Sequence, residues 1–298
     1  MSESQSNPLP PTIDASASAR WLRRSQGVWL HEEIGHRMQE RLQWMRVAPQ
    51  TWLDWCALHG GLQTHAKVRA RYPEALVYLH EQDEVRRAAA IRRLRAPWWQ
   101  RWLGWDRLRT EAHPPAQMQM VGANMMLHQS PDPQALLKQW QQALDSDGFL
   151  MFSCLGPDTL RELLLIYQDK GWPPPCHVFT DMHDWGDMLV QSGFAEPVMD
   201  MERLTLTYAT AEGILQDLRR MGRNLHRERF AALRGRGWLE RLKVALNTLA
   251  STSKDGRIHL TIEVIYGHAL KASPRVSVAQ TTTVSLQDMR TLLKTQST

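Results

Sequence analysis

The chain has 298 residues, 43% of them hydrophobic, which is enough to bury a large core as one domain or as a domain with a smaller lobe. It has no run of about 18 apolar residues, so no membrane-spanning helix is expected. Its three cysteines are too widely spaced for a disulfide framework or a metal site. The 36 basic and 31 acidic residues give a net charge of +5, which is too mild to indicate nucleic acid but suits an acidic partner.

The two ends of the chain differ in composition from its middle. Residues 1–18 are polar and rich in Ser and Pro, without the apolar core of a signal peptide, so we expect a disordered leader on a cytoplasmic protein. Residues 272–298 are rich in Ser and Thr and are expected to be a flexible tail. One folded domain is therefore expected over residues 19–271. It opens with a helical pattern over residues 19–47, where apolar residues recur at spacings of three and four.

Residues 51–80 have the pattern of a strand, a helix and a second strand. Thr51–Trp55 is the first predicted strand, residues 60–71 are the helix, and residues 75–79 are the second strand. This order is that of a right-handed βαβ crossover. The first turn, Cys56–Gly61, is where nucleotide-type cofactors lie in such folds, because helix-start amides and bare glycine backbone allow close approach.

An acidic residue follows the second predicted strand. Glu81 lies 21 residues after Gly60. In dinucleotide sites an acid about 20 residues past the turn accepts hydrogen bonds from ribose hydroxyls. Glu81 is therefore a candidate cofactor ligand.

Strand and helix patterns continue to alternate downstream. Further strands are predicted at 118–124, 149–153, 198–208 and 258–270, and further helices at 84–95, 132–144, 157–168, 184–192, 211–220 and 238–250. This alternation predicts an α/β fold with a mostly parallel sheet, helices on both faces and an antiparallel edge.

Two segments are strongly basic. Residues 96–115 interleave Trp with Arg, and residues 221–237 contain five arginines among few acids. The first segment can pack as an amphipathic helix or dock an acidic protein, and both are favoured over nucleic acid or a membrane surface. The sequence does not decide which segment docks a partner, and it does not give the oligomeric state.

Several downstream motifs are more specific than periodicity. They are residues 148–163 (GFLMFSCLGPDTLREL), 182–202 (MHDWGDMLVQSGFAEPVMDME), 263–269 (EVIYGHA) and 69–75 (RARYPEA). Together they resemble the biotin-synthesis malonyl-acyl-carrier-protein O-methyltransferases, and the resemblance covers most of residues 20–271.

The resemblance implies a Rossmann-like class I fold dependent on S-adenosyl-L-methionine (SAM), with a seven-stranded, mostly parallel sheet whose last strand is antiparallel. It implies an enzyme that methylates the free carboxyl of a malonyl thioester on acyl carrier protein, an acidic partner, during biotin precursor synthesis. A carboxylate is already a nucleophile and a sulfonium methyl is an electrophile, so alignment can carry most of the rate without a catalytic base. No catalytic residue is therefore assigned. Arg161 is the candidate for binding the malonyl carboxylate.

The opening turn departs from the family pattern. The family reads Leu-Asp-Leu-Gly-Cys-Gly-Thr-Gly, and its glycine positions fall on Cys56, Leu58 and Gly60 of this chain. Side chains at two of these positions crowd the cofactor or require another path for the loop. The predicted cofactor residues are Asp54, Cys56, Gly60, Gly61, Glu81 and Asn124. Two hypotheses follow: an enzyme with a rearranged loop, or an inactive pseudo-methyltransferase that acts as a binding or regulatory protein.

Overall fold

A six-stranded sheet forms the centre of the protein. The computed structural model describes residues 12–103, 106–109 and 117–272. The strands are β1 (Thr51–Trp55), β2 (Leu76–His80), β3 (Met118–Ala123), β4 (Leu144–Leu155), β5 (Phe194–Tyr208) and β6 (Ile258–Lys271), in the spatial order β2-β1-β3-β4-β6-β5. Strands β1 to β4 are parallel, and β6 runs antiparallel to both of its neighbours. The predicted α/β class and the antiparallel last strand are confirmed.

The predicted count of seven strands is wrong, because the described residues form six. Where a further edge strand would lie beside β2, Leu108 makes a single parallel bridge to Val77. Val77 donates its N–H to the carbonyl of Arg107 and accepts from the N–H of Arg109. Leu108 is a lone buried residue between two arginines, which is too little apolar sequence to extend a strand.

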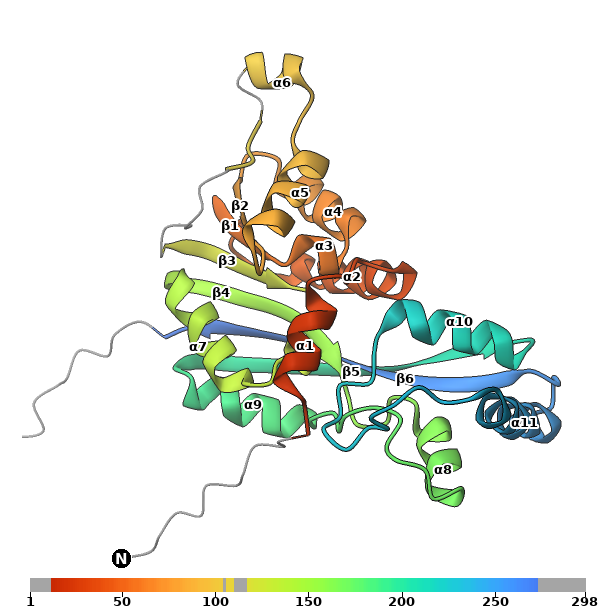
Figure 1. Cartoon of the computed structure of the whole chain (residues 1–298). Coiled ribbons are helices and arrows are strands. Elements are labelled where there is room, and N and C mark those ends of the chain that lie inside the picture. The colour runs from red at the N-terminus through yellow and green to blue at the C-terminus, as the bar shows by residue number, and fades with distance from the viewer. Residues whose placement is uncertain (1–11, 104–105, 110–116, 273–298) are drawn as a thin grey trace, which may run out of the picture.

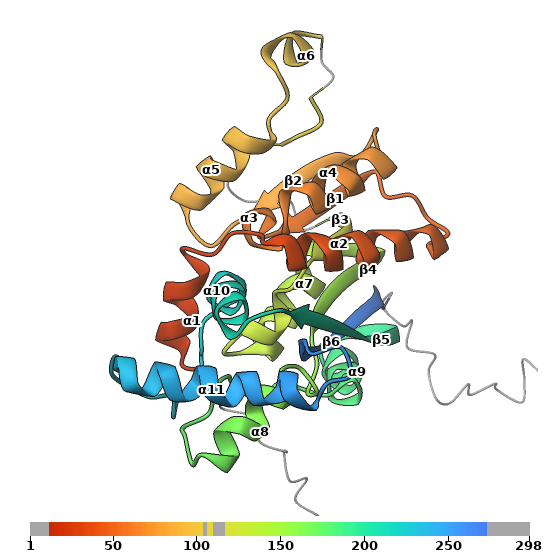
Figure 2. The ribbon, with the colours of Figure 1, turned by 90° about the vertical axis from the view of Figure 1, so that its right-hand side faces the viewer.

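Helices cover both faces of the sheet (Figures 1 and 2). The helices are α1 (Ala15–Leu22), α2 (Trp29–Arg41), α3 (Ala57–Gly60), α4 (Leu62–Arg71), α5 (Glu84–Leu94), α6 (Trp98–Trp102), α7 (Pro133–Ala143), α8 (Arg161–Asp169), α9 (Met182–Gln191), α10 (Ala211–Met221) and α11 (Arg236–Thr252). One core cluster joins the sheet to α7 and α9, and a second joins it to α2, α4 and α5. Within the described residues, no helix has the length and apolarity needed to cross a membrane.

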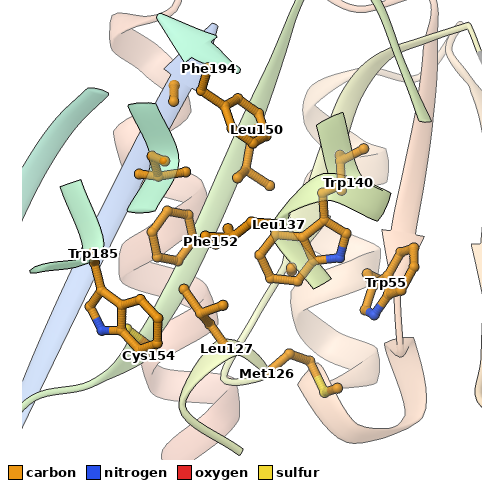
Figure 3. Packing of buried hydrophobic residues seen from close by; sticks show 14 of the residues in the cluster. Trp55, Met126, Leu127, Leu137, Trp140, Leu150, Phe152, Cys154, Trp185 and Phe194 are labelled. Atoms are coloured by element: carbon orange, nitrogen blue, oxygen red, sulfur yellow. The ribbon is translucent and has the colours of Figure 1, made fainter. Parts of the chain in front are cut away.

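Large aromatic side chains fill the cluster on the α7 and α9 face (Figure 3). Trp140 of α7 and Trp185 of α9 are buried against Phe152 of β4. The ring of Trp55 meets Trp140 edge-on, with 6.0 Å between centroids, and stacks on His80 at 3.7 Å. Alternate residues of each strand therefore point into this core and into the one on the opposite face.

Three further parts of the described chain lie at the periphery of the fold. Helices α8, α10 and α11 enclose a smaller core at the start of β6, around Leu246 and Ile258. Helix α6 stands away from the sheet at the top of Figure 1. The side chains of Trp98 and Trp102 on α6 are 73% and 83% exposed, so they do not pack on the domain. Helix α1 begins at Ala15 rather than at the predicted domain boundary of residue 19, and residues 1–11 and 273–298 lie outside the described residues.

Candidate cofactor and acceptor site

The turn after β1 gathers the residues predicted to bind the cofactor. Cys56 has left-handed backbone angles (φ 62°), the short helix α3 follows, and Gly61 (φ 122°) leads into α4. Asp54, Gly60, Gly61 and Asn124 surround one small cavity. Glu81 reaches the same turn from the end of β2. The structure therefore brings the predicted residues together, and their role as cofactor ligands stays a prediction.

The predicted ribose ligand is engaged by the protein itself. Glu81 Oε1 accepts the N–H of Leu58 at 2.9 Å, and Oε2 lies 3.2 Å from Nε of Arg86. Burial raises the pKa of the Glu81 carboxyl, and its contacts with Leu58 and Arg86 oppose that rise. Arg86 in turn donates to the carbonyl of Ser25 at 2.9 Å. Glu81 thus ties the turn to α5 and to the residues before α2.

The first amides of α4 also have a partner within the chain. Glu32, on α2, accepts the N–H of Gln63 at 3.1 Å and that of Thr64 at 2.9 Å. A carboxylate at a helix N-terminus is the favoured cap, because it satisfies free amides and complements the helix dipole. The helix start that would approach an anionic or polar ligand is therefore already capped.

His59 occupies the interior of the turn and has no exposed surface. Burial lowers the pKa of His59 well below its ordinary value, so the ring is neutral. Ser25 Oγ donates to the carbonyl of Leu22 at 3.1 Å and lies 2.8 Å from His59 Nδ1. His59 Nε2 lies 3.2 Å from both the carbonyl oxygen of Met125 and Nε2 of Gln129. These contacts on both ring nitrogens fix the orientation of the ring.

Asn124 closes the turn from the end of β3. Its Nδ2 donates to the carbonyls of His31, at 2.8 Å, and of Gly60, and its Oδ1 accepts from Ser153 Oγ at 2.6 Å. A Cβ on Gly60 would lie 3.3 Å from Asn124 Cβ, so a larger residue there requires Asn124 to shift. Asp54 is likewise paired, with its Oδ2 2.7 Å from Nδ1 of His65.

The turn encloses little free space in the conformation described. The cavity beside Asp54 and Gly60 has a volume of about 20 Å³, close to that of a single water. Ligand pockets for molecules of the size of SAM measure about 300–1,000 Å³. Leu58 and His59 are 5% and 0% exposed, so the two side chains fill the interior that a glycine turn would leave free.

A second, larger space lies beside the turn. It has a volume of about 280 Å³ and is lined mainly by apolar side chains, which come from α10, from Leu163 of α8 and from several loops and strands. His128 and Gln129 form its wall toward the turn, and Arg219 and Arg223 lie on its lining. Burial lowers the pKa of His128 well below its ordinary value, so this wall is uncharged. The cavity can hold a neutral chain, with positive charge supplied by the arginines.

Arg161 lies outside this cavity. Its side chain is 55% exposed, 3.8 Å from Asp158 and 3.4 Å from Glu162. Its role as a ligand of the malonyl carboxylate stays a prediction, and the two acids beside it compete for its charge.

Sequence reasoning missed the residues that close the turn from outside. They come from the connector Arg23–Val28, which joins α1 to α2, and from Glu32 and Arg86. The signal that was available is the replacement of glycine by Leu58 and by a neighbouring His, since side chains at a turn must be buried by something. The pattern gave no indication that the connector does so.

Comparisons with known proteins agree with the fold. No protein-family model matches the chain. A solved structure of a putative methyltransferase from Bacillus halodurans superposes with a TM-score of 0.51 at 14% identity, covering 81% of this chain and 100% of that one. The strand order, the antiparallel last strand and the turn after β1 therefore define a class I methyltransferase fold.

Curated relatives identify the family. A malonyl-[acyl-carrier protein] O-methyltransferase from Gallionella capsiferriformans is 39% identical over 258 residues, covering 83% of this chain and 86% of that protein. Another, from a Methylovorus species, is 34% identical over 281 residues, covering 89% and 92%. The chain belongs to the malonyl-[acyl-carrier protein] O-methyltransferase family. The predicted family is confirmed, and with it the prediction of a SAM-dependent methyltransferase at the level of enzyme class.

Proposed function

We propose that this protein transfers a methyl group from SAM to the free carboxyl of a malonyl thioester carried on an acyl carrier protein. The observation that carries the proposal is the 39% identity, along most of both chains, to a protein named for that reaction. Masking the carboxylate gives fatty-acid enzymes a neutral chain that they can extend toward biotin. The proposal includes the cytoplasmic location expected from the sequence.

This methyl transfer needs no side chain as an acid or base catalyst. The malonyl carboxylate is the nucleophile and is already ionised at neutral pH. The bond formed joins its oxygen to the methyl carbon, the bond broken joins that carbon to sulfur, and no proton is transferred. Orientation in a space that excludes water can therefore supply most of the acceleration.

The cavity of about 280 Å³ is our candidate for the acceptor side. Its mainly apolar lining suits the thioester arm, and Arg219 and Arg223 can pair with the carboxylate or with acidic groups of the carrier. Both arginines have exposed side chains, so a partner can reach them. Of the two basic segments, the arginines of α10 and its following loop contact the cavity, whereas α6 stands far from it (Figure 1).

Incubation of the full chain with malonyl-acyl carrier protein and a saturating concentration of SAM tests this function. Intact-protein mass spectrometry is expected to show one added methylene on the malonyl carrier. Acetyl-acyl carrier protein is the matched control, because it has the same thioester and no free carboxyl. Methylation of neither carrier, or of both equally, would contradict the proposal.

A further inference from the structure

The turn Cys56–Gly61 is held shut from outside by backbone contacts. Gly27, in the connector, donates its N–H to the carbonyl of Leu58 at 2.6 Å. A Cβ on Gly27 would lie 2.7 Å from Gly61 Cα, so the connector and the turn touch without a side chain between them. The carbonyl of His59 also accepts from His31 Nδ1 of α2, at 2.8 Å.

The turn is also held from inside, by the groups that would otherwise serve a cofactor. The Leu58 N–H is bound by Glu81, the α4 amides are capped by Glu32, and the His59 ring lies between Ser25 and Gln129. A ligand at this turn must break several of these buried hydrogen bonds before it can replace them. A buried polar group that is left without a partner carries an energetic penalty, so opening the turn opposes binding.

We propose that Leu58 and His59 are a built-in plug of the cofactor turn, and that these two residues set the affinity of this chain for SAM. The donor binds only when the turn and the connector Arg23–Val28 separate. The inference rests on the proposed function for the identity of the donor and is independent of the acceptor. It explains how the chain keeps the family fold while it departs from the family turn at Cys56 and Leu58.

Calorimetric titration with SAM tests the plug. The natural chain is compared with the triple variant Cys56→Gly, Leu58→Gly, His59→Thr, which has the glycine pattern of the family. We expect the variant to bind SAM at least tenfold more tightly. The matched control is Leu246→Gly, which removes an equally buried leucine from the remote core of α11 and is expected to leave the SAM affinity unchanged.

A second variant works without removing core side chains. Gly27→Ala places a methyl group against Gly61 Cα, which pushes the connector off the turn. This variant is also expected to bind SAM more tightly than the natural chain. It tests the plug by itself if the triple variant does not fold. A folded variant that binds no tighter than the natural chain would overturn the plug. A complex of the natural chain with tightly bound SAM and with Leu58 and His59 unmoved would also overturn it.

The result is separable from the proposed function. Tight SAM binding by the triple variant without methylation of malonyl-acyl carrier protein supports the plug and contradicts the acceptor. Methylation by the natural chain at saturating SAM, together with a gain in affinity in the variant, supports both.

Discussion

The turn after β1 and the space beyond Gln129 differ in how much free volume they enclose. The turn after β1 is packed until a cavity of about 20 Å³ remains, and its polar groups Asp54, Glu81 and Asn124 are bound to the chain itself. The space beyond Gln129 keeps about 280 Å³ and a mainly apolar lining. Gln129 lines the larger space, and its Nε2 lies 3.2 Å from Nε2 of His59 in the turn.

Of these two spaces, the larger is the one that we propose for the acceptor. A glycine turn leaves its interior open, whereas here the buried side chains of Leu58 and His59 fill it. The larger cavity is lined by other parts of the chain, among them Phe179, Leu163 of α8 and Leu218 of α10. The two regions can therefore be perturbed separately.

The largest expected effect is on the stability of the turn. Glu81→Ala leaves the guanidinium of Arg86 buried without its carboxylate, and the Leu58 N–H without its acceptor. Removing one partner of a buried ion pair costs about 3–5 kcal/mol in the free energy of unfolding. Urea denaturation of the natural chain and of the variant measures this loss.

Two further variants control that measurement. Glu84→Ala removes an acid of α5 that is 72% exposed and paired with Arg87, and the expected loss is at most about 1 kcal/mol. Replacing Glu81 and Arg86 together by leucine removes both charges, and we expect it to recover much of the loss. If Glu81→Ala were as mild as Glu84→Ala, the turn would not depend on this ion pair.

The fold was largely predictable from the sequence because its signals are local. The alternation of strand and helix patterns and the family motifs gave the class of fold, and the antiparallel edge was expected from the two late strands that flank helices. The prediction of a seventh strand was wrong because Leu108 is a single apolar residue among arginines. Only its position beside Val77 in the structure shows that it forms a bridge.

The sequence could predict that the residues of the candidate site lie close together. It could not predict how the side chains of the turn are buried. Asp54, Gly60, Glu81 and Asn124 do converge, since parallel strands bring their carboxyl ends to one edge. That Gly27 would lie on Gly61 is a contact between segments more than thirty residues apart, and no periodicity encodes it. The sequence could show that glycines were replaced, but only the tertiary structure shows which groups bury the replacements.

A smaller expected effect is the dependence of stability on pH. The pKa of His59 lies well below its ordinary value in the folded chain because the ring is buried, whereas the unfolded chain gains a proton below about pH 6.5. The unfolded state thus binds more protons, and stability falls as the pH falls through that value. His59 contributes at most one proton to this difference, which corresponds to about 1.4 kcal/mol per pH unit.

His59→Asn isolates this contribution. Other buried histidines, such as His128, also have lowered pKa values. The variant is therefore expected to reduce the difference in bound protons between the unfolded and folded states by up to one, without abolishing it. The measurement is the slope of the free energy of unfolding between pH 5 and about pH 6. An unchanged slope in His59→Asn would mean that the ring is not buried in solution.

The next effect concerns the open region and follows from the proposed function. Leu218→Trp fills part of the cavity from α10, so kcat/KM for the malonyl carrier is expected to fall about tenfold or more while SAM affinity stays the same. Leu165→Trp on α8, where the side chain is 63% exposed and outside the lining, serves as the control. A loss of SAM affinity in Leu218→Trp would show that the two regions are not separate.

The smallest expected effect distinguishes two positions for the malonyl carboxylate. Arg219 lines the cavity, whereas Arg161 is 55% exposed and lies beside Asp158 and Glu162. Arg219→Ala is expected to raise KM for the malonyl carrier about threefold at low salt and less at high salt, because exposed charges are screened. Arg161→Ala is expected to change KM less than about twofold at either salt concentration. The reverse order would make Arg161 the carboxylate ligand and would require α8 to turn toward the cavity, which would join the acceptor region to a surface that is separate from it in the structure.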